Sequence, residues 1–233
     1  KEGIENAVIG HIVEQSAGAT YTEAEVTYKL IPPQKDLFWE VFFNAGEILR
    51  KASLTPDEKL CSDLKTTVDR LKKANISKLL PEIGSNIGYT VNGKTTAEVA
   101  AVPGRIFRVE NETYSVRDPK MGISVYMADT LLILRGKFPE AQCVMNLRST
   151  PKIIDACRRE GFRMADMPMP AGYWQRGNEY DTDLKKVIAG ATGLPDVITI
   201  PDRINLEKLI VVTGTSLADF ERKVLALNAA VAE

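Results

Sequence analysis

The sequence has few of the residues that build metal centres, disulfide frameworks and proton relays. In 233 residues it contains one histidine, His11, and three cysteines, Cys61, Cys143 and Cys157. A single histidine near the amino end excludes a multi-histidine metal site and a histidine relay in the main domain. The cysteines are odd in number and far apart, which fits neither a zinc site nor a secreted disulfide framework. We therefore predict no metal site and a reducing, cytoplasmic setting.

The chain also lacks long apolar runs and a surplus of charge of either sign. No run approaches the roughly 20 apolar residues that a membrane helix requires, and no charged-then-apolar stretch indicates a leader segment. The first residue is Lys1 rather than Met, which leaves room for an upstream segment. Lysine and arginine number 30 and aspartate and glutamate 31, for a formal net charge of −1. No stretch carries the concentrated positive charge that phosphate backbones attract. We expect neither membrane insertion nor nucleic-acid binding through this chain alone.

The spacing of apolar residues predicts a helical amino-terminal segment over residues 1–54. Residues 4–15 and 38–49 each place apolar side chains on one helical face. A further helix is predicted to begin after Thr55, a candidate cap followed by proline and two acidic residues, and to run to about Lys73. Its apolar positions recur on one face, so we expect it to pack on the domain that follows.

Beyond Leu79 the pattern changes to short β-prone runs separated by turn residues. Strands are predicted over 88–91, 98–102, 105–109, 143–147, 197–200 and 209–212, and helices over 127–134, 150–161 and 216–229. Asn92-Gly93 is typical of a hairpin turn. Because strands and helices alternate without an internal repeat, the sequence predicts an α/β domain over 55–233.

Two segments interrupt apolar runs with glycine, proline and polar residues. They are Pro-Glu-Ile-Gly-Ser-Asn-Ile at 81–87 and Val-Pro-Gly-Arg-Ile at 102–106. With the later runs 121–128, 145–148 and 194–198, in this order, they resemble the archaeal thiamine-phosphate synthase domain of the ThiN type. The resemblance implies a three-layer α/β domain with a mixed sheet, similar to the aldolase-like architecture of that family, and a homodimer.

The family's reaction joins a pyrimidine diphosphate to a thiazole phosphate and releases pyrophosphate. An arginine, backbone amides or a magnesium ion would stabilise the negative charge that develops as the pyrophosphate departs. Arg105, beside Gly104, is the predicted catalytic and phosphate contact, although an arginine after Pro-Gly can also simply tie down a turn. The other predicted ligand contacts are Ser85, Asn86, Asn146, Arg148, Arg203 and Glu207.

The sequence departs from the family pattern at two places. Tyr126 stands where the family carries a functionally important histidine. The tyrosine hydroxyl can donate a hydrogen bond, but an ordinary pKa of about 10 makes it a poor proton carrier near neutrality. A glycine-rich turn with a lysine is replaced by 201–207, where Leu206 occupies the lysine position and Arg203 is the candidate substitute.

Three functions are compatible with these features. The favoured hypothesis is a domain that binds thiamine phosphate or a related phosphorylated precursor, with catalysis lost or altered, and reports the ligand to another module. The second is an active thiamine-phosphate synthase, for which magnesium is the candidate cofactor. The third is an interaction or scaffold protein whose amino-terminal segment is the working part. The partner of the first two is a small phosphorylated ligand.

Overall fold

The chain divides into two units, residues 1–53 and 54–233. The computed structural model describes residues 19–23, 26–30, 54–169, 179–202 and 207–232. The second unit contains every predicted site residue, and Arg203 alone among them lies outside the described residues. Within the described ranges, no helix combines the length and the apolar character that crossing a bilayer requires.

The first unit contains a β-hairpin that the sequence did not predict. Strands β1 (Ala19–Glu23) and β2 (Val26–Leu30) pair antiparallel from Ala19 opposite Leu30 to Glu23 opposite Val26. The helices expected over 4–15 and 38–49 lie outside the described residues.

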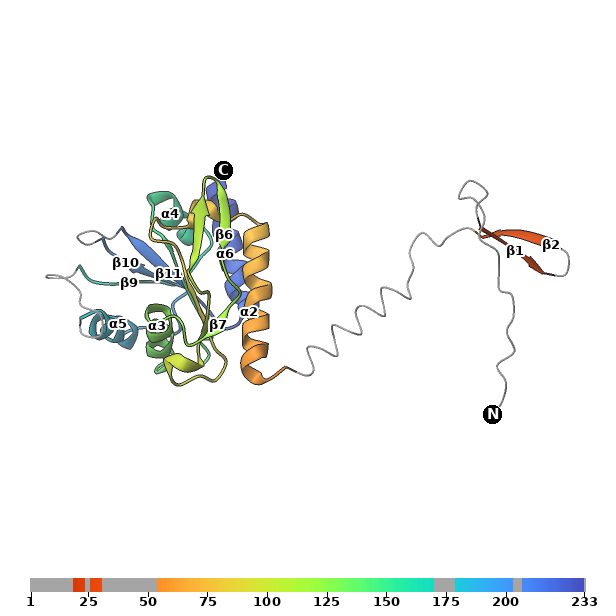
Figure 1. Cartoon of the computed structure of the whole chain (residues 1–233). Helices are drawn as coiled ribbons and strands as arrows, with labels where there is room; N and C mark the ends of the chain where they lie inside the picture. The colour runs from red at the N-terminus through yellow and green to blue at the C-terminus, as the bar shows by residue number, and fades with distance from the viewer. Residues whose placement is uncertain (1–18, 24–25, 31–53, 170–178, 203–206, 233) are drawn as a thin grey trace, which may run out of the picture. The chain divides into compact units, whose positions relative to one another are not determined.

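The second unit is built on a seven-stranded mixed sheet (Figure 1). Its strands are β3 (Ile87–Tyr89), β4 (Ala100–Ala101), β7 (Lys120–Met121), β8 (Cys143–Arg148), β9 (Met164–Asp166), β10 (Val197–Ile200) and β11 (Leu209–Gly214). The strand order is β7-β4-β3-β8-β11-β10-β9, so β8 lies at the centre. Only the β9–β10 pair is parallel among these neighbours. A separate hairpin joins β5 (Ile106–Val109) to β6 (Glu112–Ser115).

Helices cover both faces of this sheet. On one face lie α2 (Pro56–Lys73), α4 (Pro151–Arg159) and α6 (Leu217–Ala232), and on the other lie α3 (Tyr126–Arg135) and α5 (Glu179–Ala189) (Figure 1). Strand β8 serves both layers because its side chains alternate: Cys143 and Met145 belong to the first core and Val144 to the second. The three-layer α/β fold with a mixed sheet is therefore confirmed.

Local signals placed several element boundaries correctly. The Thr55 hydroxyl accepts a hydrogen bond from Glu58 N at 3.3 Å, and the Glu58 carboxylate accepts one from Thr55 N at 2.8 Å, which closes a capping box. Helix α4 begins in the same manner, since the Thr150 hydroxyl accepts from Ile153 N at 3.3 Å. Such caps act within one turn of chain, so the sequence alone could reveal them.

The region between β3 and β4 differs from the prediction. Asn92-Gly93 does not join two strands directly, because β3 and β4 pair at Tyr89 and Ala100 around a longer connection. The strand predicted over 98–102 is reduced to β4, and a 3₁₀ helix, Thr96–Glu98, precedes it. The Thr90 hydroxyl accepts from Gly93 N at 2.8 Å and so closes the turn by itself. A second 3₁₀ helix covers Ser77–Leu79.

A buried ammonium ties α6 to β11 and to Asp196, the residue before β10. Lys223 Nζ lies 2.7 Å from Asp196, 2.8 Å from Asp219 and 3.0 Å from the Thr213 carbonyl, with a side chain only 4% exposed. Burial alone would raise the pKa of Asp196 and Asp219, but hydrogen bonds and attraction from Lys223 outweigh it and hold both below their usual value. All three donors of the ammonium are thus paired.

Replacing Lys223 is expected to destabilise the domain strongly. Lys223→Met should lower the free energy of unfolding by about 3 kcal/mol, because it leaves two carboxylates and a carbonyl without their buried cation. Urea unfolding followed by circular dichroism measures the change. Lys186→Met is the matched control, since the Lys186 side chain is 70% exposed and the loss of its ion pair with Asp183 should cost less than about 0.5 kcal/mol. Equal effects of the two substitutions would contradict the buried role of Lys223.

The same cluster predicts an acid dependence. Because the folded-state pKa of Asp196 and Asp219 is lowered, their stabilising contribution is full above the unfolded pKa of about 4 and is lost as the pH falls through the folded value. The difference in unfolding free energy between the wild type and Lys223→Met should therefore shrink below about pH 4. Urea titrations at several pH values test this, and a difference independent of pH would refute it.

Candidate functional site

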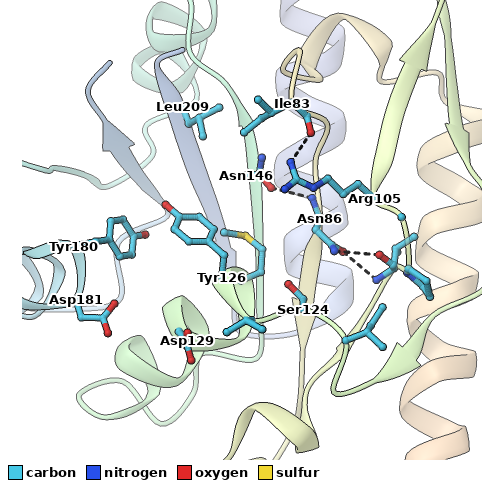
Figure 2. A pocket seen from close by; sticks show the side chains of 16 residues that line it. Ile83, Asn86, Arg105, Ser124, Tyr126, Asp129, Asn146, Tyr180, Asp181 and Leu209 are labelled. Atoms are coloured by element: carbon cyan, nitrogen blue, oxygen red, sulfur yellow. Dashed lines mark hydrogen bonds between the residues drawn. The ribbon is translucent and has the colours of Figure 1, made fainter. Parts of the chain in front are cut away.

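A cavity of about 820 Å³ opens on the α3–α5 face of the sheet, beside the second half of β8 (Figure 2). It is lined by Ile83, Asn86, Val102, Pro103, Gly104, Arg105, Ile123, Ser124, Val125, Tyr126, Met127, Asp129, Asn146, Tyr180, Asp181 and Leu209. Its size is in the range of pockets that enclose small ligands. Both glycine- and proline-containing segments of the sequence, 81–87 and 102–106, contribute to its wall.

Two asparagine side chains join these segments to the centre of the sheet. Asn146 Oδ1 accepts from Asn86 N at 2.8 Å, and Asn146 Nδ2 donates to the Gly84 carbonyl at 3.1 Å. Asn86 Oδ1 accepts from Val102 N at 3.0 Å and Ile87 N at 2.8 Å, while its Nδ2 donates to the Val102 carbonyl at 3.1 Å. Each side-chain amide has a second N–H that makes no hydrogen bond drawn in Figure 2 or among the described residues. The two residues therefore hold the wall together and also line the cavity.

Arg105 completes this wall from a tight turn. Residues 102–105 form a turn in which Arg105 N donates to the Val102 carbonyl at 3.2 Å, with Gly104 at a φ of +79°. A Cβ on Gly104 would meet nothing within 4 Å. The turn therefore requires glycine for its positive φ and not for its small size. The Arg105 guanidinium donates to the Ile83 carbonyl at 2.5 Å and remains exposed at the cavity. It thus ties the turn to the first segment while presenting positive charge.

Three predicted contacts lie near the cavity without lining it. Ser85 is fully buried, its backbone pairs with Ile106, and its hydroxyl has no hydrogen-bond partner among the described residues. Arg148, two residues after Asn146 on β8, has a buried Nε that is also unpaired within the described part of the chain. The Glu207 carboxylate accepts from Glu82 N and so anchors the first segment. Their roles as ligand contacts remain predictions.

The opposite wall is aromatic and acidic. The rings of Tyr126, at the start of α3, and Tyr180, on α5, lie with centroids 5.0 Å apart and planes inclined by 42°. Asp129 and Asp181 line the same side of the cavity (Figure 2). Of these four residues, sequence reasoning found only Tyr126. No pattern in the sequence links α5 to the cavity, because its contribution depends on how it packs beside α3.

The described cysteine and acidic residues do not form a metal centre or a reactive thiol. No group of three or more histidine, cysteine, aspartate or glutamate side chains within the described ranges could hold a metal ion. Burial raises the pKa of the Cys157 thiol to about 11 and that of Cys143 well above its usual value, so both thiols stay protonated. The polar groups that line the cavity are amides, hydroxyls, carboxylates and a guanidinium.

The amide network predicts a stability effect. Asn86→Ala and Asn146→Ala should each lower the free energy of unfolding by about 2–4 kcal/mol, because each leaves two or more backbone groups near the cavity unpaired. Thermal or urea unfolding measures the loss. Asn92→Ala is the matched control: Asn92 is exposed, and the change should be within about 0.5 kcal/mol. Losses no larger than that of the control would show that water replaces the amides without cost.

Comparison with known proteins agrees with this architecture. The family model for thiamine-phosphate synthase ThiN matches residues 63–226. The chain is 28% identical over 148 residues to thiamine-phosphate synthase ThiN of Methanothermobacter thermautotrophicus, covering 58% of this chain and 74% of that protein. The C-terminal domain of phosphomethylpyrimidine kinase is similar in structure, with a TM-score of 0.64 and 24% identity over 72% of this chain and 98% of that one. The C-terminal domain of protein MJ0236 gives a TM-score of 0.67 and 25% identity over 77% and 98% of the two chains. The chain belongs to the ThiN family of thiamine-phosphate synthase domains.

Proposed function

We propose that the cavity binds thiamine phosphate or a related phosphorylated thiamine precursor, and that catalysis is lost or altered. The observation that carries the proposal is the position of Tyr126. The residue that replaces the family histidine lies on the cavity wall, and its ring packs on Tyr180. A tyrosine at this place can contribute contact and a hydrogen bond, but not the imidazole that commonly carries protons near neutrality.

The two walls of the cavity suit the two ends of such a ligand. The tyrosine rings offer flat apolar surface for a heteroaromatic ring, and the carboxylates of Asp129 and Asp181 suit a ring that bears an amine or a positive charge. On the other wall, Arg105 and the remaining amide N–H groups suit phosphate oxygens. A pocket can keep such ground-state contacts while it loses those that act only in the transition state.

An active synthase is the second candidate. The observation in its favour is that Arg105, Asn86 and Asn146 meet at one cavity, so the groups expected to orient the substrates are assembled. The Tyr126 hydroxyl would suffice if the family histidine acts mainly by hydrogen bonding. Magnesium commonly binds phosphates with one or two carboxylates, and Asp129 and Asp181 are the carboxylates that line the cavity.

Binding and turnover separate the two candidates. With thiamine phosphate at 100 times its dissociation constant, the wild-type protein should gain about 2.7 kcal/mol of stability in thermal unfolding. With both phosphorylated precursors and magnesium, it should release little pyrophosphate, and Tyr126→His should raise that rate. Tyr114→His is the matched control, since Tyr114 is 42% exposed on β6 and does not line the cavity.

Three results would count against the proposal. Rapid pyrophosphate release by the wild type that disappears in Arg105→Ala would establish the active synthase instead. If Tyr114→His raised turnover as much as Tyr126→His, the position of Tyr126 on the cavity wall would no longer support the proposal. No stabilisation by any thiamine-related phosphate would leave the scaffold hypothesis. The homodimer stays a prediction, which sedimentation velocity tests.

A further inference from the structure

The hydroxyl of Thr130 lies between two tyrosines of the cavity wall. Thr130 is 0% exposed and follows Tyr126 by one turn of α3. Its Oγ1 donates to the Tyr126 carbonyl at 2.9 Å and lies 3.2 Å from the Tyr180 hydroxyl. Tyr126 and Tyr180 line the cavity, whereas Thr130 itself does not. Any influence of Thr130 on a ligand must therefore pass through the tyrosines.

The directions of these two hydrogen bonds follow from the number of protons. A threonine hydroxyl has one proton to donate, and a carbonyl oxygen can only accept. The Thr130 proton is directed to the carbonyl four residues earlier, which is a common arrangement of threonine in a helix. The bond between Thr130 and Tyr180 therefore has the phenol as its donor. Because Tyr180 gives its proton to Thr130, its oxygen meets a ligand as a hydrogen-bond acceptor.

The polar groups beside Tyr180 are acceptors as well. Asp129 and Asp181 line the same side of the cavity, and an ionised carboxylate accepts hydrogen bonds without donating any. Figure 2 shows the Tyr180 oxygen on this side, directed toward Tyr126. Tyr180 is only 4% exposed, so water cannot readily correct a mismatched pair of acceptors there. This side of the cavity therefore favours a ring that presents N–H groups over a ring that presents an oxo group.

We propose that Thr130 is a positioning residue that makes this side of the cavity selective for a ring with an amino group. By accepting the Tyr180 proton, it keeps the phenol oxygen an acceptor and holds the Tyr180 ring beside that of Tyr126. The assignment rests on the proposed function, which supplies a ligand whose pyrimidine ring carries an amino group. It adds a residue that decides which ring is accepted, and the sequence analysis did not select that residue.

Calorimetric titration with thiamine phosphate and oxythiamine phosphate, which carries an oxo group in place of the amino group, tests the assignment. The wild type should bind thiamine phosphate at least about 10-fold more tightly. Thr130→Val should reduce that ratio to about 3-fold or less, because Tyr180 can then donate to the oxo group. Thr130→Ser keeps the hydroxyl and should preserve the ratio.

The control and a second variant keep the test sharp. Thr66→Val is the matched control, because the exposed Thr66 hydroxyl makes the same kind of bond to the Ser62 carbonyl on α2, outside the cavity. It should leave the ratio unchanged. Tyr180→Phe removes the acceptor itself and should also reduce the ratio, so the test holds even if Thr130→Val does not fold. Thermal unfolding verifies the folding of each variant.

The other outcomes separate this assignment from the proposed function. If folded Thr130→Val bound both phosphates more weakly at an unchanged ratio, Thr130 would serve packing alone, and the assignment would be overturned while the proposed function stands. Equal affinity of the wild type for the two phosphates would have the same meaning, as would a ratio that collapses in Thr130→Ser. Binding of neither phosphate by the wild type would overturn the proposed function and the assignment with it.

Discussion

The hydrogen bonds of Asn146 and Asn86 are the interaction on which the cavity depends. Asn146 is 6% exposed in the central strand, and its amide reaches two backbone groups of the segment that enters β3. Asn86 extends the same connection to Val102 through one donated and one accepted bond. Backbone groups in irregular segments find no partners in the sheet ladder, and burial without partners is costly. The two amides supply those partners, so the loops can line a cavity.

The buried charged cluster around Lys223 lies away from the cavity. In the antiparallel pair of β8 and β11, Leu209 lies opposite Arg148 and Gly214 opposite Cys143. Leu209 lines the cavity, whereas Thr213, at the other end of β11, accepts from the buried Lys223. The charged cluster therefore lies toward the opposite end of the strands. This arrangement keeps a strong buried field away from the place where a charged ligand would bind.

The segments 81–87 and 102–106 form one wall of the cavity, and residues of α3 and α5 form the opposite wall. Asn86, Gly104 and Arg105 line the cavity, and the side chains of Asn86 and Arg105 also bond backbone carbonyls of neighbouring segments. Tyr126, on the opposite wall, packs on Tyr180.

The sequence by itself determined features that act within a few residues: the cap at Thr55, the apolar face of α2, the Pro-Gly turn before Arg105 and the runs that became β8, β10 and β11. It did not reveal that Ser85 is turned into the interior beside Ile106. Nor did it reveal that Tyr180 meets Tyr126. Those contacts join segments distant in the chain: the bridge between Ser85 and Ile106 joins two loop ends, and the packing of α3 beside α5 brings the two tyrosines together. Short-range hydrogen bonds depend on neighbouring residues, so the sequence reveals them. A cavity forms only where several elements pack together, so the tertiary structure decides it.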